Sequence, residues 1–167
     1  VADLARAVGF TQISASHEVS PLMKLVPRGL TSVVDAYLSP ILRRYVARVS
    51  AGLPNDARLM FMQSNGGLVD AQRFRGKDAI LSGPAGGIVG MARTSAAAGY
   101  DRVIGFDMGG TSTDVALLAN GQCRLSGEAT VHGYPIKAPM LDIHTVGAGG
   151  GSIAFVDSGG LLKVGPA

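Results

Sequence analysis

The stretch from Asp107 to Asp114, DMGGTSTD, gathers carboxylates, hydroxyls and adjacent glycines within eight residues. Because glycine has no Cβ, backbone N–H groups in such a turn can approach an anion closely, and threonine hydroxyls can add further donors. Residues 102–107 and 113–119 have the composition of strands. The pattern predicts a phosphate-binding turn between two strands, and the alternative is an ordinary glycine-rich hairpin. The residues predicted to hold the phosphate are Gly109, Gly110, Thr111 and Thr113.

The two carboxylates stand at the ends of the predicted strands, Asp107 at the end of the first and Asp114 at the start of the second. Mg²⁺ in proteins keeps several waters and takes only one or two carboxylates. We therefore predict that Asp107 and Asp114 hold Mg²⁺ or another divalent cation and serve the catalytic reaction. The alternative is a pair of solvated aspartates.

A second candidate group lies in DIHTVGAGGGS, residues 142–152. On a strand, Asp142 and His144 would lie on one side, so we predict Asp142 as a metal ligand and His144 as a catalytic, proton-transferring residue. The alternative is that His144 donates to a backbone carbonyl and fixes the loop. The following glycines are predicted to contact the nucleotide, although the loop lacks the lysine of a P-loop and could be a purely structural turn. These glycines are Gly147, Gly149 and Gly150.

Other candidates carry a weaker signal. SGPAGG, residues 82–87, precedes a predicted helix over 88–98, so it is either an anion site at the helix N-terminus or a loop whose glycines permit close packing. His17, Glu18 and His132 are less favoured metal or proton-transfer candidates. Cys123 has no histidine or asparagine nearby in sequence and is not predicted to be a nucleophile.

The elements that position these residues follow from periodicity and turn signals. We expect a helix over residues 1–8 capped by Gly9, and a second over 38–49 with Ser39 as N-cap and Pro40 in its first turn. Strands are expected at 10–14, 58–63, 102–107, 113–119 and 122–126, the last two joined by Asn120-Gly121. This order predicts a mixed α/β sheet rather than a doubly wound parallel one.

Composition limits the class of protein. The chain has 167 residues, 47% hydrophobic and 16% charged, which is enough apolar material for a core. A net charge of +3 with scattered basic residues predicts no nucleic-acid surface. No apolar stretch has bilayer-spanning length, and a single cysteine fits a reducing compartment, so we expect a cytoplasmic protein without a membrane segment. Because the chain does not begin with Met, we interpret it as a piece of a longer polypeptide.

The strings SHEVSP, MQSNGGL, LSGPAGGIVG, GFDMGGTSTDVALL and DIHTVGAGGGSIAFVDSGGLLKVGPA resemble the hydantoinase A/5-oxoprolinase family. Its members include the hydantoinase A-type component of N-methylhydantoinase and related components of acetone-type carboxylases. The resemblance covers nearly the whole chain. It implies a partial ribonuclease-H-like or actin-like ATPase fold, the fold of acetate and sugar kinases, heat-shock protein 70 and actin. Residues 1–99 would lead into the domain, and residues 100–167 would carry the phosphate-binding hairpin and the glycine-rich loop.

The function implied by the resemblance is an ATP- and Mg²⁺-dependent hydrolase that phosphorylates and opens a cyclic amide such as a hydantoin or 5-oxoproline, working with a second, hydantoinase B-type subunit or domain. The chain has no second DxGGT motif, so we expect it to be inactive alone. The alternatives are a sugar or acetate kinase, a nucleotide-binding module without catalysis, and part of an acetone-type carboxylase.

Overall fold

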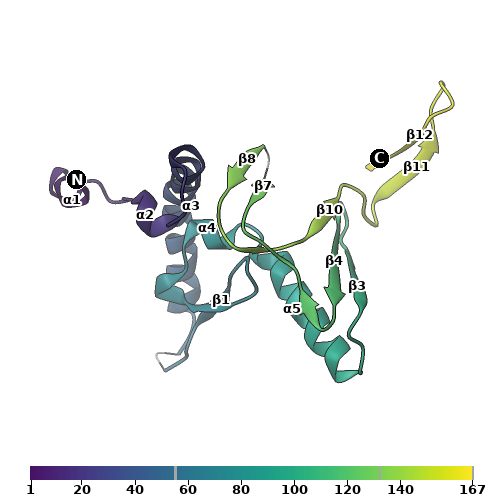
Figure 1. Ribbon diagram of the computed structural model, residues 1–167, viewed down its shortest axis with the longest axis horizontal. Helices are drawn as coiled ribbons and strands as arrows, with labels where there is room; N and C mark the ends of the chain where they lie inside the picture. Colours follow the sequence, from purple (N-terminus) through teal and green to yellow (C-terminus); the bar gives the residue numbers. More distant parts are fainter. Residues whose placement is uncertain (55, 132, 167) are drawn as a thin grey trace. The chain divides into compact units, whose positions relative to one another are not determined.

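The computed structural model describes residues 1–54, 56–131 and 133–166, so the weak candidate His132 lies outside the described residues. The fold is mixed α/β with small antiparallel sheets (Figure 1). The chain forms two compact units: unit 1 contains residues 1–85 and 125–141, and unit 2 contains residues 86–124 and 142–167. The expected division into a leading segment, residues 1–99, and a hairpin-and-loop region, residues 100–167, stays a prediction.

Unit 1 is built on one long helix and several short elements. Its helices are α1 (Ala2–Val8), α2 (Ser16–Val19), α3 (Leu25–Ala51), the 3-10 helix η1 (Ala71–Arg73) and α4 (Gly76–Ala79). Three antiparallel strand pairs accompany them: β1 (Met60–Met62) with β2 (Leu68–Asp70), β6 (Leu125–Ser126) with β9 (Met140–Leu141), and β7 (Ala129–Val131) with β8 (Tyr134–Ile136). The predicted cap of α1 is confirmed, because Gly9 has a φ of 102°.

Helix α3 begins well before the predicted start at Ser39, and Pro40 lies inside it. The expectation was wrong because the Ser39 hydroxyl does not cap a helix end; it donates to Asp35 Oδ1 one turn earlier, at 3.2 Å. The strand predicted at residues 10–14 is also wrong. That segment is irregular, and the Ser14 hydroxyl donates to Asp35 Oδ2 at 2.7 Å.

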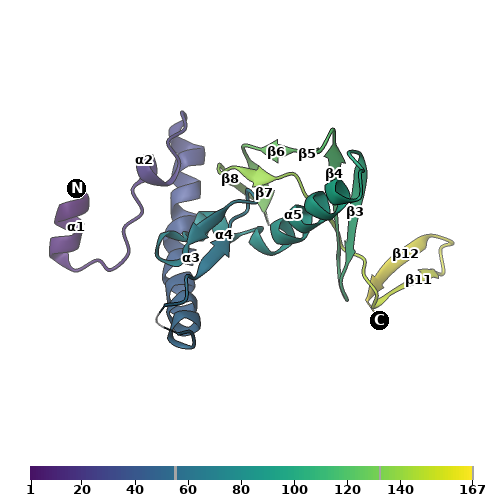
Figure 2. The ribbon, with the colours of Figure 1, turned by 90° about the horizontal axis from the view of Figure 1, so that it is seen from below.

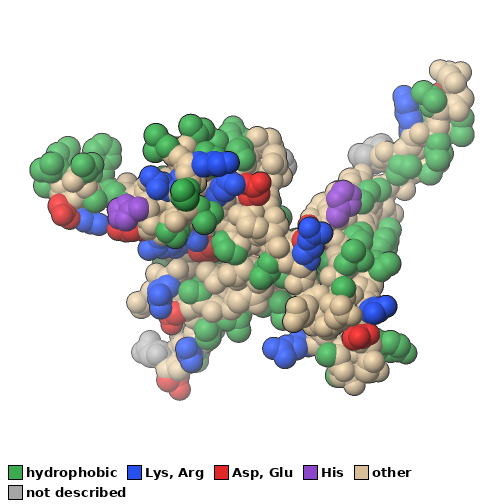
Figure 3. Space-filling view, in the orientation of Figure 1, with side chains coloured by type: hydrophobic (Ala, Val, Ile, Leu, Met, Phe, Trp, Pro, Cys, Tyr) green, Lys and Arg blue, Asp and Glu red, His purple; other side chains and the backbone are tan. Residues whose placement is uncertain are grey.

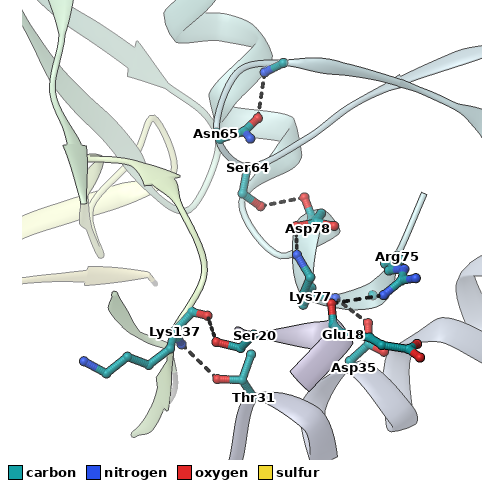
Figure 4. A network of polar contacts seen from close by, with 12 residues as sticks. Glu18, Ser20, Thr31, Asp35, Ser64, Asn65, Arg75, Lys77, Asp78 and Lys137 are labelled. Carbon is teal, nitrogen blue, oxygen red and sulfur yellow. Dashed lines mark hydrogen bonds and ion pairs between the residues drawn. The ribbon is translucent and has the colours of Figure 1, made fainter. Parts of the chain in front are cut away.

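The core of unit 1 joins segments that are distant in sequence. Ile136, Ala138 and Met140 are buried and pack against residues of α3 and of the segment that follows α4, including Val34, Ile80 and Leu81. Lys137 is fixed between them, because its N–H donates to Thr31 Oγ1 and its carbonyl accepts from Ser20 Oγ, both at 2.9 Å (Figure 4). The segment 125–141 therefore completes this unit.

Ser64, in the SNGG segment that follows β1, is almost fully buried and connects several segments of the chain. Its N–H and its hydroxyl both donate to the Asp78 carbonyl, at 2.7 and 2.8 Å. Its Oγ accepts from Leu81 N–H, and its carbonyl accepts from Leu141 N–H. Every polar group of Ser64 thus has a partner, as burial requires.

Asp35 is the other buried polar centre of unit 1, with 3% of its surface exposed. Besides the two serine hydroxyls, its Oδ1 accepts from Lys77 N–H at 3.2 Å, so one carboxylate links α3, the irregular N-terminal segment and α4.

Replacing Asp35 with alanine should lower the free energy of unfolding by about 3 kcal/mol, since three donors lose a charged acceptor. Urea denaturation of the chain measures this. Asp56→Ala, at an exposed turn, is the control and should change stability by less than about 0.5 kcal/mol. Equal stability of the two variants would contradict a structural role for Asp35.

Hydrophobic side chains gather on the surface over α3 and β8 (Figure 3). They border a groove of about 950 Å³ whose lining includes Tyr37, Ile41, Tyr45 and Tyr134. Among the described residues, no helix combines the length and apolar composition needed to cross a bilayer.

Unit 2 contains a four-stranded antiparallel sheet and a hairpin. The sheet is formed by β3 (Val103–Met108), β4 (Thr113–Ala119), β5 (Gln122–Cys123) and β10 (His144–Val146), with β4 between β3 and β10 and with β5 also paired to β4. The hairpin is β11 (Ser152–Val156) with β12 (Leu162–Pro166). Asn120 and Gly121 have positive φ, 53° and 72°, and confirm the predicted β4–β5 turn. The strand predicted at residues 122–126 is divided in the structure. Its first part is β5, which ends at Cys123, and its second part is β6, which belongs to unit 1.

Helix α5 (Ser82–Ala97) includes SGPAGG in its first turns, so the prediction of a loop at residues 82–87 was wrong. Pro84 is compatible with helix there, since the first turn lacks N–H partners in any case. From Gly86 onward α5 belongs to unit 2, where it runs beside β3 (Figure 2). The helix approaches closely: a Cβ on Gly105 would lie 2.3 Å from Met91 Sδ.

Candidate phosphate-binding site

The turn between β3 and β4 has the predicted position. In the β3–β4 register Asp107 lies opposite Asp114 and Met108 opposite Thr113, and Gly109 N–H closes the turn by donating to Ser112 O at 2.9 Å. Gly109, Gly110 and Thr111 are exposed, and a Cβ on Gly110 would meet nothing within 4 Å. Within the part of the chain that the structure describes, the Gly110 and Thr111 amides donate to no protein acceptor.

The two aspartates share one face of the sheet, because residues directly opposite in an antiparallel pair point to the same side. That face is the one toward α5, since a Cβ on Gly87 would lie 3.5 Å from Asp107 Oδ2. Asp114 is oriented by Thr145, whose hydroxyl donates to Asp114 Oδ1 at 2.6 Å. The arrangement leaves carboxylate oxygens of both residues beside the turn, a donor set that suits a hydrated divalent cation.

The structure does not bring His144 to this face. His144 pairs with Val115, and Thr145 pairs with Asp114, so the exposed imidazole points to the opposite side of the sheet from the two aspartates. If the register between β10 and β4 were shifted by one residue, His144 would lie opposite Asp114 and on the same face as the two aspartates. The catalytic role of His144 stays a prediction. Because the imidazole lies on the opposite face of the sheet, His144 and Asp107 do not form one cluster of side chains.

Asp142 precedes β10, which begins at His144, so the two residues do not share a strand. The Asp142 carboxylate lies 3.7 Å from Arg124 Nε, and Asp142 N–H donates to the Arg124 carbonyl at 2.9 Å. No group of three or more histidine, cysteine, aspartate or glutamate side chains among the described residues could hold a metal ion. The structure therefore does not join Asp142 to the aspartate pair, and its role as a ligand stays a prediction.

The glycine-rich loop that follows β10 packs directly on the β3–β4 turn. Gly150 N–H donates to the Gly109 carbonyl at 2.9 Å, and Gly151 N–H donates to the Gly110 carbonyl at 2.8 Å. The Thr113 hydroxyl donates to the Ala148 carbonyl at 2.6 Å. These bonds turn the carbonyls of the two turn glycines toward the loop, which holds the turn in one conformation.

Gly149 is the closest point of this contact. An ideal Cβ on it would lie 2.6 Å from Gly109 O and 2.7 Å from both Gly110 C and Thr111 N, so only glycine fits. The Gly149 amide donates to Ser152 Oγ at 2.9 Å. By contrast, Gly147 has open space at its Cβ position. The amides of Gly149 and Gly150 are thus engaged within the protein, and contact of these glycines with a nucleotide stays a prediction.

Three residues of this arrangement were not predicted from sequence: Thr145, Gly151 and Ser152. Thr145 and Ser152 orient other groups through hydroxyls, and nothing in their types distinguishes them from other polar residues. Gly151 belongs to the GGG run and could have been included on that ground. Cys123, in β5, is half-buried, and burial raises the pKa of its thiol, which agrees with the expectation that it is not a nucleophile.

Comparison with known proteins gives the family. A profile of the hydantoinase/oxoprolinase family matches residues 28–167. The chain is 48% identical to 5-oxoprolinase of Saccharomyces cerevisiae over 173 aligned positions, covering 99% of this chain and 13% of that protein. It is 41% identical to the alpha subunit of caprolactamase from Pseudomonas jessenii, covering 92% of this chain and 23% of that protein.

Two solved structures have the same fold. The crystal structure of the ATP-dependent caprolactamase from Pseudomonas jessenii matches with a TM-score of 0.83 and 40% identity, covering 99% of this chain and 25% of that one. Nucleotide-free acetone carboxylase, an enzyme of ATP-dependent acetone carboxylation, matches with a TM-score of 0.79 and 25% identity. The match covers 99% of this chain and 24% of that one. The chain thus spans a quarter or less of the length of these relatives. With a family profile matching most of its residues and close relatives aligned along nearly all of its length, the chain belongs to the hydantoinase/oxoprolinase family.

Proposed function

We propose that this chain provides one phosphate-binding half of an ATP-dependent enzyme that activates and opens a cyclic amide. The observation that carries the proposal is the exposed turn at Gly109–Thr111, with open space at Gly110 and the Asp107–Asp114 pair on one face beside it. The names of relatives support the substrate class, since both 5-oxoproline and caprolactam are lactams.

Each group in the turn has a defined part in this proposal. The free amides at Gly110 and Thr111 would bind phosphate oxygens, because converging N–H groups stabilise an anion. Asp107 and Asp114 would hold the accompanying Mg²⁺, and Thr145 keeps Asp114 oriented toward it. Bound ATP would supply the γ-phosphoryl group that activates the amide oxygen. The protein's contribution to such a transfer is mainly positioning and charge stabilisation.

The wider architecture belongs to the same proposal. We infer a ribonuclease-H-like or actin-like ATPase fold, and the strand–turn–strand element formed by β3 and β4, with α5 beside it, supports this inference. In such a fold a second phosphate-binding turn would face this one. The caprolactamase relative is named as an alpha subunit, which supports a second component, for which a hydantoinase B-type protein is the candidate. The reaction would take place in the cytoplasm, where ATP and Mg²⁺ are abundant.

Part of an acetone-type carboxylase is the second candidate, favoured by the structural match to acetone carboxylase. The higher identity to 5-oxoprolinase and caprolactamase favours amide opening. A nucleotide-binding module without turnover is the remaining alternative.

ATP hydrolysis separates these candidates. A polypeptide of the relatives' length that carries this segment, combined with its hydantoinase B-type partner, should hydrolyse ATP when 5-oxoproline, hydantoin or caprolactam is added. The 167-residue chain, assayed in parallel, should give no substrate-dependent phosphate release. Stimulation by acetone and bicarbonate alone would favour the carboxylase, and no stimulation by any compound would favour the module. Turnover by the short chain would contradict the proposal that it holds half a site.

A further inference from the structure

Unit 1 contains a second cleft with polar walls, which the phosphate site does not use. Its volume is about 520 Å³, which is the size of a site for a small molecule. The cleft lies between the N-terminal segment, α3 and the stretch from η1 to α4, and Figure 4 shows Glu18, Asp35, Arg75 and Lys77 from its lining. Among the described residues, four basic and three acidic side chains line it: Arg43, Arg73, Arg75, Lys77, Glu18, Asp35 and Asp78.

Two of these seven charges, Lys77 and Asp78, are paired with each other. Lys77 Nζ lies 2.6 Å from Asp78 Oδ1, and both side chains are largely buried. Asp35 keeps its negative charge, but its side chain is buried and its two oxygens accept three hydrogen bonds from neutral donors. With Lys77 and Asp78 cancelling each other, the three arginines of the wall face the carboxylates of Glu18 and Asp35, so the wall keeps a small excess of positive charge.

The two arginines are presented to the cleft by Phe74 between them. Phe74 is buried and stacks on Phe61 with ring centroids 5.0 Å apart, which anchors this stretch. Phe74 and Arg75 have extended backbone angles, and Arg73, Phe74 and Arg75 all line the cleft. Arg75 Nη1 makes only a 3.5 Å contact with the Glu18 carbonyl, and in the part of the chain described here Arg73 has no hydrogen-bond partner.

We propose that this cleft binds a small carboxylic acid, with Arg73 and Arg75 holding its carboxylate. Guanidinium groups match carboxylates in geometry and charge, and two arginines separated by one residue can converge on one anion. The amides of Gln63 and Gln72, with Ile13 and Val69, supply polar and apolar contacts for the remainder of the ligand. Three acidic residues in the same wall favour a singly charged ligand over a phosphate. The inference does not rest on the proposed ATP-dependent function.

The test is a titration of the 167-residue chain without nucleotide, followed by ¹H–¹⁵N NMR. L-5-Oxoproline and 2-pyrrolidinone are the matched probes, because they differ only in the carboxylate. Saturable shifts of the amides of residues 72–77 are expected with the first and not with the second. The double variant Arg73→Gln, Arg75→Gln should weaken binding at least about tenfold, whereas Arg44→Gln, on the same helix as Arg43 but outside the cleft, should change it less than about twofold.

The inference is overturned by absence of saturable binding, by equal binding of 2-pyrrolidinone, or by unchanged affinity in the double variant. Tighter binding of inorganic phosphate at the same amides would overturn the assignment to carboxylates. All arginines replaced are exposed, so the variants should keep the melting temperature of the parent chain.

Discussion

Replacing Gly149 with alanine should lower the free energy of unfolding of unit 2 by about 3 kcal/mol, because the new Cβ would overlap backbone atoms that cannot move aside. The overlapping atoms belong to Gly109, Gly110 and Thr111, all within 2.7 Å. Relief requires the loop to withdraw, which breaks the bonds from Gly150 and Gly151 to the turn carbonyls. The turn would then lose the conformation in which its amides face outward, and ATP binding would be lost with it.

Thermal denaturation of the chain measures the first effect, and the amide resonances of residues 109–112 report the second. Gly147→Ala is the matched control, since it lies in the same loop with open space around its Cβ and has no positive φ. It should stay within about 0.5 kcal/mol of the parent chain. If both variants were equally stable, the loop would not be packed on the turn as described.

Gly110→Val is expected to have the opposite profile, with folding retained and nucleotide binding lost. The position is open and does not require a positive φ, so the protein itself can accept a branched side chain. The same open space is where a phosphate would approach the amides. Loss of two hydrogen bonds to a charged group should weaken ATP binding at least about 100-fold.

The measurement is ATP affinity by titration calorimetry, in a polypeptide of the relatives' length that carries this segment. Gly127→Val serves as the control, because Gly127 lies in unit 1 and is equally open. Normal ATP affinity in Gly110→Val would mean that the turn is only structural, and the proposed function would fail with it.

The β3–β4 turn could be predicted because its determinants are local. Strand composition on both sides, two glycines between them and Asn120-Gly121 after them are read within a few residues, and the structure confirms all three. Helix α3 was predicted too short for the same reason. Gly29, Pro27 and Pro40 argue against helix locally, whereas hydrogen bonds of the buried Thr31, Asp35 and Ser39 to other segments stabilise it.

The function of the glycine loop could not be predicted, because it depends on a contact across about forty residues of chain. Glycine clusters indicate that backbone approaches something closely, but the sequence does not say whether that partner is a ligand or the protein itself. Here the described partner of Gly149 is the turn. The face of His144 poses a similar problem, since it depends on the register between β10 and β4, and a shift of one residue would place His144 on the same side as Asp114.

The interrupted path of unit 1 has a consequence for how the chain folds during synthesis. Residues 1–85 leave the ribosome before residues 125–141, but the core that they surround needs Ile136, Ala138 and Met140. Until those residues emerge, Val34, Ile80 and Leu81 lack their partners in this core and are open to chaperones or to wrong contacts. Residues 86–124 separate the two parts of unit 1, and this loop must close before the core can form, so we expect unit 1 to fold slowly. The β3–β4 hairpin of unit 2 can form earlier, because its strands are adjacent in sequence.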